Sequence, residues 1–359
     1  MSATIRQALA AAGLSPRRGA PVPYRGSTFD GVAHVVDSPM RTRGDEAIAR
    51  SESANGSGQG PFLARSHTND AGTRAYKVYI PTSYATGATQ PVPLVVMLHG
   101  CTQTPDDFAA GTRMNALAEE RGFLVVYPAQ APNANGSRCW NWFRPEDQAR
   151  ESGEPSLIAG ITHEVASTYR IDRERIFVAG LSAGAAMAVI LGTTYPDLYA
   201  AVGAHSGLPY GAAQDMPSAF RVMRDGTVAT RRSLRPDDDP AASGRASQRV
   251  ATIVFHGDRD ATVHARNGMA IVENAIVDHP DALDRGARAS AGIAAGGRRY
   301  SQTVYFDADN RTIVEQWLLH GAGHAWSGGS PDGSFTDAAG PDASAEMIRF
   351  FYSRSPRSA

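Results

Sequence analysis

Apolar residues from about position 72 onward follow two patterns that alternate along the chain. Short apolar runs that stop at a glycine or proline are typical of strands buried in a parallel sheet. They occupy residues 93–100 (PLVVMLHG), 123–128, 175–180, 199–207 and 250–258. Segments with apolar residues at helical spacing separate these runs, at residues 111–122, 155–170, 183–196 and 265–279. Strands that alternate with helices of this length predict βαβ units and a mainly parallel sheet, which is an α/β fold.

Further elements flank this region. Residues 73–81 (TRAYKVYIP) alternate between polar and apolar positions, as a half-buried strand does. Residues 302–307 and 311–321 predict a final pair of strands, and residues 342–353 predict a C-terminal helix that docks on the domain.

Two segments show no sustained period. Residues 1–60 are rich in Gly, Pro, Ser and Arg, which is typical of a tail or linker. Residues 224–249 are polar and contain many breaker residues, so we expect a surface excursion there. The pattern therefore predicts one α/β domain over residues 61–359, preceded by the tail and interrupted by the excursion.

Composition narrows the class of protein. The 359 residues are 42% hydrophobic and 20% charged, which is ordinary for a soluble globular chain. The 35 basic and 36 acidic residues give a net charge of −1 without a basic block, which argues against a nucleic-acid or anionic-membrane partner. No apolar stretch approaches the roughly 20 residues needed to cross a bilayer. The N-terminal apolar segment precedes its basic pair, the reverse of a signal peptide.

Ser182 is the candidate nucleophile. The pentapeptide Gly180-Leu181-Ser182-Ala183-Gly184 fits the G-x-S-x-G elbow, in which a serine stands on a sharp turn between a strand and a helix. The match alone is weak in a chain with 36 glycines. The strand predicted over 175–180 and the helix predicted over 183–196 supply the context that the elbow requires. The alternative is a serine that caps the helix.

His324 is the candidate general base. A serine hydroxyl needs an oriented imidazole to take its proton, and in this type of fold the chain order is Ser, acid, His. His324 lies in a glycine-rich loop after the last apolar strand, where an imidazole reaches the edge of the sheet. His320 is the second choice because it ends the strand and is expected to be packed.

Asp260 is the candidate acid that orients the histidine. It follows the buried run 250–257 by a few residues, far enough past Gly257 to turn toward a neighbouring loop. Asp258 is the close alternative, and Asp307 and Asp309 are weaker because they follow a later strand.

Acyl transfer also needs donors for the oxyanion. Residues 95–108 (VVMLHGCTQTPDDF) resemble the His-Gly loop that follows the third strand in such folds. We expect the backbone N–H of Cys101, with Thr102 as second choice, to act together with that of Ala183.

Five ordered motifs resemble the polyhydroxybutyrate (PHB) depolymerase family of esterases, whose relatives include feruloyl and acetylxylan esterases. They stand at residues 98–130 (LHGCTQTPDDFAAG and onward), 137–143 (SRCWNWF), 175–207, 256–263 (HGDRDATV) and 321–329 (GAGHAWSGG). The resemblance spans roughly residues 65–328. It implies an α/β-hydrolase fold with Ser182, Asp260 and His324 as the catalytic triad, which agrees with the assignment from position.

The resemblance also implies a serine esterase that acts on a small-molecule or oligomeric ester through an acyl-enzyme. The first expectation is 3-hydroxybutyrate oligomers, PHB-type polyesters or short-chain esters, and the alternative is feruloyl or acetylxylan ester cleavage. A second alternative is a binding module that kept the fold and lost its chemistry. The sequence has no metal cluster, phosphate loop or dinucleotide fingerprint, so we expect no metal and no cofactor.

Cys101 and Cys139 are the two cysteines of the chain. A disulfide between them would tie the aromatic loop at 140–143 to the oxyanion turn, and it would imply an oxidising, extracellular or periplasmic compartment, as for secreted members of the family. The alternative is a pair of reduced thiols. Trp142 and Trp326 are candidate substrate-binding residues, although aromatic side chains also serve as core.

Overall fold

The computed structural model describes residues 60–87, 89–227, 250–277, 279 and 286–353. The predicted tail, apart from residue 60, and most of the predicted excursion lie outside the described residues. The strands of the described part form a ten-stranded sheet in the order β1-β2-β4-β3-β5-β6-β7-β10-β9-β8, with a separate pair of two-residue strands, β11 (Trp326–Ser327) and β12 (Thr336–Asp337).

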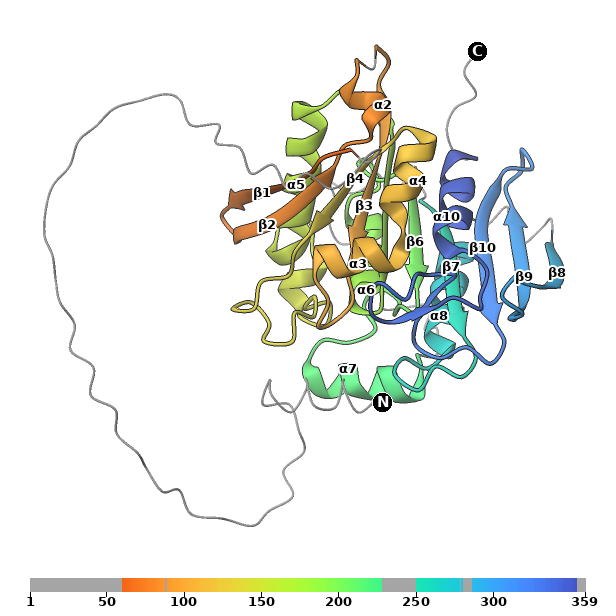
Figure 1. Cartoon of the computed structure of the whole chain (residues 1–359). Coiled ribbons are helices and arrows are strands. Elements are labelled where there is room, and N and C mark those ends of the chain that lie inside the picture. The colour runs from red at the N-terminus through yellow and green to blue at the C-terminus, as the bar shows by residue number, and fades with distance from the viewer. Residues whose placement is uncertain (1–59, 88, 228–249, 278, 280–285, 354–359) are drawn as a thin grey trace, which may run out of the picture.

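Six neighbouring strands in the middle of the sheet are parallel, as the sequence predicted. They are β4 (Leu124–Pro128), β3 (Val92–Leu98), β5 (Ile171–Leu181), β6 (Ala201–His205), β7 (Ala251–Gly257) and β10 (Thr312–Leu319). Antiparallel strands extend the sheet at both edges. They are β1 (Phe62–Asn69) and β2 (Gly72–Tyr79) at one edge, and β9 (Arg299–Phe306) and β8 (Ala287–Ile293) at the other (Figure 1).

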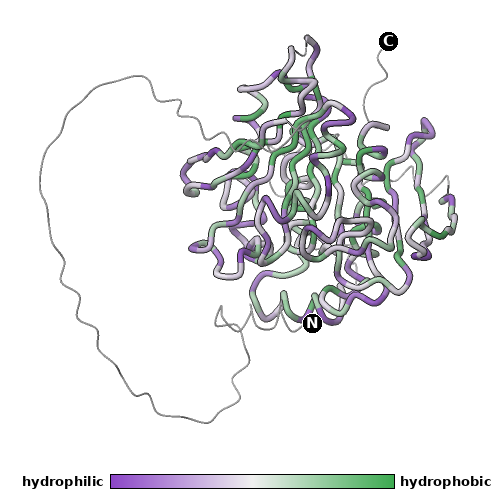
Figure 2. The backbone as a smooth tube through the Cα atoms, in the orientation of Figure 1, coloured by the Kyte–Doolittle hydropathy of each residue, from purple (hydrophilic) through white to green (hydrophobic). Residues whose placement is uncertain are grey.

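The central strands are apolar on both faces because helices cover both. In β3, Leu94, Val96 and Leu98 pack into the core on one face, whereas Val95 and Met97 pack into the core on the other. All five side chains are fully buried. Successive side chains of a strand point to opposite faces, so a continuous apolar run is what a doubly covered strand requires. Figure 2 shows hydrophobic residues concentrated along these central strands.

Helices from different parts of the chain form the two outer layers. One layer contains α5 (Gly153–Thr168), α6 (Ala183–Thr194) and α8 (Arg266–Val277). The opposite layer contains α3 (Pro105–Thr112), α4 (Met114–Arg121) and α10 (Ala343–Tyr352). The short α2 (Thr82–Ala85) follows β2, and the 3-10 turn η1 (Pro145–Gln148) precedes α5. This arrangement is the α/β-hydrolase fold that the sequence predicted.

The structure departs from the predicted elements in several places. The helix expected over 111–122 begins later, as α4, because Arg113 takes a left-handed conformation (φ 55°) after α3 ends at Thr112, and α3 itself was not predicted. Edge strands β1 and β8 were not predicted; their exposed residues give a weak apolar signal. Helix α7 (Met216–Asp225) was not predicted either. In the part of the chain that the structure describes, no helix is long and apolar enough to span a bilayer.

Candidate active site

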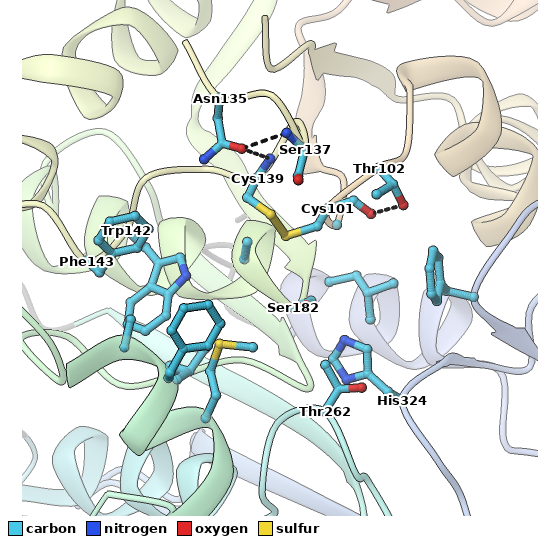
Figure 3. A pocket seen from close by; sticks show the side chains of 18 of the residues that line it. Cys101, Thr102, Asn135, Ser137, Cys139, Trp142, Phe143, Ser182, Thr262 and His324 are labelled. Atoms are coloured by element: carbon cyan, nitrogen blue, oxygen red, sulfur yellow. Dashed lines mark hydrogen bonds between the residues drawn. A yellow bond between two sulfur atoms is a disulfide. The ribbon is translucent and has the colours of Figure 1, made fainter. Parts of the chain in front are cut away.

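Residues that follow five of the parallel strands line a single pocket (Figure 3). Gly100 follows β3, Leu181 ends β5, Leu208 follows β6, Thr262 follows β7 and His324 follows β10. The carboxyl ends of parallel strands meet at one edge of a sheet, where open α/β folds place their ligands. The pocket is therefore built by the fold and is a natural place for chemistry.

Ser182 stands on a sharp turn at the mouth of this pocket. It lies between the end of β5 and the start of α6, with φ 59° and ψ −119°. Such a conformation costs a non-glycine residue about 1–3 kcal/mol, and it recurs at functional sites. The flanking residues must be glycine because no side chain fits there. A Cβ at Gly180 would lie 2.4 Å from the Gly184 carbonyl carbon, and a Cβ at Gly184 would lie 2.1 Å from Leu98 O.

His324 and Asp260 form a buried pair, and His324 lines the same pocket as Ser182. Nδ1 of His324 lies 2.7 Å from Oδ2 of Asp260, with 8% of the histidine side chain and none of the aspartate side chain exposed. Because an ionised carboxylate only accepts hydrogen bonds, Nδ1 carries the proton and Nε2 is left available. The second oxygen, Oδ1, accepts the N–H groups of Thr262 (2.9 Å) and Val263 (2.8 Å).

These contacts keep Asp260 ionised in spite of its burial. Burial by itself raises the pKa of the carboxyl, but the charge and hydrogen bond of His324, together with His256 and the Val263 N–H, lower the pKa to about 2. The carboxylate can therefore hold a protonated His324 in place during a reaction.

The second-choice residues form a pair of their own. Nδ1 of His320 lies 3.0 Å from Oδ2 of Asp258, and both side chains are 35% exposed. The weaker candidates Asp307 and Asp309 lie in the turn between β9 and β10, where Asp307 Oδ1 accepts two backbone N–H groups. Of these candidates, His324 is the one that lines the pocket.

The turn after β3 and the start of α6 contain the backbone N–H groups expected to serve as oxyanion donors. Thr102 donates its backbone N–H to Ser137 O at 2.7 Å, so that group is already committed. Cys101 and Ala183 both line the pocket next to Ser182. Ala183 is the first residue of α6, where backbone N–H groups have no partner within the helix. This favours Cys101 over Thr102 as the partner of Ala183.

Buried His99 fixes the shape of this turn. Its Nδ1 donates to Gly100 O at 2.8 Å, and its Nε2 accepts the Gln130 N–H at 3.0 Å. Burial lowers the pKa of His99 to about 4, so the ring is neutral at pH 7 and the tautomer is set by these two bonds. Gly100 O and the Cys101 N–H belong to the same peptide plane, so the bond to His99 also fixes the direction of that N–H.

A disulfide joins the oxyanion turn to the aromatic loop. Cys101 and Cys139 are bonded, with an S–S distance of 2.03 Å. Trp142 and Phe143, from the loop just after Cys139, line the pocket with their rings edge to face. Trp140 points the other way, is fully buried, and donates Nε1–H to His99 O at 3.1 Å. The loop therefore contributes two aromatic side chains to the pocket and one to the core.

Trp326 is placed differently from the prediction. It is 1% exposed, donates its indole N–H to Ser344 Oγ at 3.0 Å, and stacks on His205 with ring centroids 5.2 Å apart. It does not border the pocket that the described residues form. The indole is packed in the core, so its nearness to His324 in the sequence does not make it a pocket residue.

Helix α7 provides a wall that sequence reasoning missed. Met216, Ala219, Phe220 and Met223 border the pocket from this helix. Figure 1 shows α7 lying across the end of the sheet. The signal was present in the sequence: Asp215 is a helix cap, and apolar residues follow at spacings of three and four. Its position next to the polar excursion obscured it.

The pocket wall is largely apolar. Among the described residues that border the pocket, none is lysine, arginine, aspartate or glutamate. Within the same described part of the chain, no group of three or more His, Cys, Asp or Glu side chains could hold a metal ion.

The chain is similar to proteins named as esterases and depolymerases. The family model described as "Esterase PHB depolymerase" matches residues 74–294, which include Ser182 and Asp260. The chain is 33% identical to poly(3-hydroxyalkanoate) depolymerase C of Paucimonas lemoignei, over 72% of this chain and 59% of that protein. It is 27% identical to feruloyl esterase B of Neurospora crassa, over 72% of this chain and 85% of that protein.

Another relative and one solved structure are also similar to this chain. Poly(3-hydroxybutyrate) depolymerase of Ralstonia pickettii is 27% identical, over 70% of this chain and 51% of that protein. The chain thus spans little more than half the length of both depolymerases. Acetyl xylan esterase from Aspergillus awamori has a similar fold, with a TM-score of 0.61 and 21% identity over 81% of this chain and 99% of that one.

Proposed function

The chain belongs to the esterase PHB depolymerase family, and from this we propose that it hydrolyses carboxylic esters through an acyl-enzyme on Ser182. The observation that carries the proposal is the buried His324–Asp260 pair together with a serine on a strand-to-helix elbow, with Ser182 and His324 both lining one apolar pocket. A serine hydroxyl becomes a competent nucleophile only when such an oriented imidazole takes its proton.

The first half of the proposed reaction forms the acyl-enzyme. Ser182 Oγ attacks the ester carbonyl carbon while Nε2 of His324 takes the hydroxyl proton. The carbonyl oxygen becomes an oxyanion, which accepts the backbone N–H groups of Cys101 and Ala183. The tetrahedral intermediate then collapses, the C–O bond to the alcohol breaks, and the proton on His324 passes to the leaving alkoxide.

The second half releases the acid. A water molecule gives a proton to His324 and its oxygen attacks the acyl carbon, and the second tetrahedral intermediate expels Ser182, which recovers its proton. Throughout both halves Asp260 keeps Nδ1 of His324 protonated and stabilises the imidazolium when it forms. Because the carboxylate is held by Thr262 and Val263 as well, its position is fixed before substrate arrives.

The apolar wall supports an uncharged acyl group as the substrate. Trp142, Phe143, Phe220 and Met223 border the space next to Ser182, and no cationic side chain among the described residues is placed to neutralise a free carboxylate there. The leading substrates are 3-hydroxybutyrate oligomers, PHB-type polyesters or other short-chain esters. Two of the relatives are named as depolymerases of poly(3-hydroxyalkanoate) and poly(3-hydroxybutyrate). Feruloyl or acetylxylan esters are the alternative, supported by the names of other relatives.

A substrate panel tests this proposal. Purified enzyme is assayed on 3-hydroxybutyrate oligomers, short-chain nitrophenyl esters, methyl ferulate and acetylated xylan, with the Ser182→Ala variant as the control. We expect hydrolysis of the first two classes that Ser182→Ala abolishes. Higher kcat/KM on ferulate or xylan acetate would move the proposal to the alternative. Failure of every ester together with no reaction with a fluorophosphonate probe would support a non-catalytic binding module instead.

The disulfide supports an oxidising compartment, extracellular or periplasmic. Cysteines in reducing compartments are rarely bridged. The test is the intact mass of protein from its native host, alkylated under denaturing and non-reducing conditions. Two alkylated thiols would contradict this location.

A further inference from the structure

A second chain of hydrogen bonds, from Asp258 through His320 to Ser301, lies beside the proposed triad. Asp258 Oδ2 is 3.0 Å from Nδ1 of His320, and Nε2 of the same ring is 2.8 Å from Ser301 Oγ. The order of groups is that of a Ser–His–Asp triad. We infer that these three residues are positioning residues, which hold the loop that carries His324 against the loop that carries Asp260. The inference rests on the proposed role of His324 as general base.

Asp258 is bonded to the His324 loop at two points. Besides the His320 ring, its Oδ1 accepts the backbone N–H of Gly321 at 2.7 Å. Gly321 is three residues before His324, and Asp258 is two residues before Asp260. One carboxylate therefore ties the start of one catalytic loop to the start of the other.

The backbones of the two loops are also in direct contact. Asp258 N–H donates to Leu319 O at 3.1 Å, and Arg259 N–H donates to Ala322 O at 3.0 Å. A Cβ at Gly257 would lie 2.4 Å from Ala322 O, so the loops approach too closely for a side chain. Because the two loops are packed this closely, loss of the Asp258 contacts will shift the loop that carries His324, and with it the His324 ring.

The ionised state of Asp258 suits this role. Burial favours the neutral carboxyl, but the Gly321 N–H, the bond to His320 and the charges of His320 and Arg259 outweigh it, so the pKa is lowered. The carboxylate therefore accepts both hydrogen bonds over the range in which a histidine base works.

Ser301 is placed to hold the His320 ring, and it lacks the features of a nucleophile. It lies within the regular strand β9, paired with Leu318 of β10 and Ala291 of β8. Its backbone groups take part in the sheet ladder, whereas Ser182 stands on a strained turn at a helix N-terminus. The Ser301 hydroxyl lies 2.8 Å from Nε2 of His320, and this hydrogen bond fixes the plane of that ring.

The decisive experiment compares Asp258→Ala with Asp307→Ala. Asp307 is a matched control, because its carboxylate also accepts two backbone N–H groups in a turn but lies at the far end of β10. We expect kcat of Asp258→Ala to fall about 10- to 100-fold, since small misplacements of catalytic groups cost that much. KM should stay within about threefold and Asp307→Ala should keep the wild-type kcat, as neither change alters the pocket wall.

Two conservative variants exclude a general folding defect. Asp258→Asn keeps an oxygen for the Gly321 N–H, so it should recover part of the kcat lost in Asp258→Ala. His320→Gln removes the imidazole that bonds to Ser301 and should also lower kcat. It tests the inference independently if Asp258→Ala does not fold. Equal kcat for Asp258→Ala, His320→Gln and Asp307→Ala would overturn the inference.

Ser182→Ala separates this inference from the proposed function. If Ser182→Ala retains full activity, the proposed function fails. If Ser182→Ala is inactive and Asp258→Ala retains wild-type kcat, the inference alone fails. Fluorophosphonate labelling of Ser301 in the Ser182→Ala protein would also overturn it, because Ser301 would then be a nucleophile.

Discussion

His324 Nδ1 and Asp260 Oδ2 are 2.7 Å apart, in a setting where the aspartate side chain is fully buried and the histidine nearly so. The pair joins two loops separated by 64 residues in the sequence. Low exposure strengthens the charge-assisted hydrogen bond, because no water competes for it.

Asp260→Asn should lower kcat/KM by about a thousandfold or more, because an amide favours the wrong histidine tautomer. Asp258→Asn should cost at least tenfold less, since Asp258 contacts the catalytic loop without contacting His324. Steady-state kinetics of the two variants gives the ranking. The opposite ranking would assign the role of the acid to Asp258.

The pH dependence of kcat/KM should report the histidine base. Because the pKa of Asp260 is lowered to about 2, its carboxylate stays ionised throughout the working range. A fall in kcat/KM as the pH drops from 8 to 5 then reflects protonation of the base. A flat profile over this range would contradict a histidine base.

Glu154 should make stability depend on pH. It is 4% exposed, accepts hydrogen bonds from the backbone and side chain of Asn141, and also contacts Gln130. Burial, together with the charge of Asp147, raises the pKa of Glu154 to about 7. A group with a raised folded-state pKa contributes stability below its unfolded value, and this is lost as pH rises through the folded value.

The free energy of unfolding should therefore fall between pH 4.5 and 7, by up to about 3 kcal/mol by linkage. Glu154→Gln, which does not titrate, should lack this component. Urea denaturation of both proteins at pH 5 and pH 8 measures the difference. Equal pH dependence in the two proteins would show that Glu154 does not titrate in this window.

Loss of the disulfide should affect stability and substrate binding more than the chemical step. Cysteines 38 residues apart give an entropic stabilisation of about 4 kcal/mol in the loop-closure model. The double variant Cys101→Ser, Cys139→Ser keeps the Cys101 backbone N–H position, so Tm should fall and KM should rise while kcat changes less. Calorimetry and steady-state kinetics test both parts; an unchanged Tm and KM would refute them.

Phe220 should set acyl-group preference. It borders the pocket from α7, whereas the neighbouring Arg221 is exposed and does not border it. Phe220→Ala should raise KM for longer acyl esters about 10-fold, as expected for the loss of a buried aromatic contact, with a smaller change for acetyl esters. Arg221→Ala is the matched control and should resemble wild type. Equal changes for both ester lengths would remove Phe220 from the acyl pocket.

The sequence was sufficient to predict the central sheet and the approximate place of the site. Buried parallel strands give continuous apolar runs, and the residues just after them must meet at one edge of the sheet. Ser182, Asp260 and His324 are the candidates that these positions select. The choice between Asp258 and Asp260 could not be made with certainty from position, because both follow β7 and each has a histidine partner after β10.

Other features depend on packing that no local pattern encodes. Trp326 follows His324 closely, yet it turns into the core because Ser344 and His205 offer its ring a partner and a stacking face. The wall formed by α7 is set by how that helix crosses the sheet edge. At the break between α3 and α4, the Arg113 guanidinium contacts Gly328 O and Asp342, which lie more than 200 residues away in the sequence.

We propose that Ser182 carries the acyl group during turnover. The most direct test of this proposal is mass-spectrometric mapping of the enzyme after rapid acid quenching with a slowly hydrolysed ester. We predict an acyl adduct on the peptide that contains Ser182, absent from the Ser182→Ala protein, which should also lose more than 99% of kcat. An adduct on another residue, or full turnover by Ser182→Ala, would contradict the account.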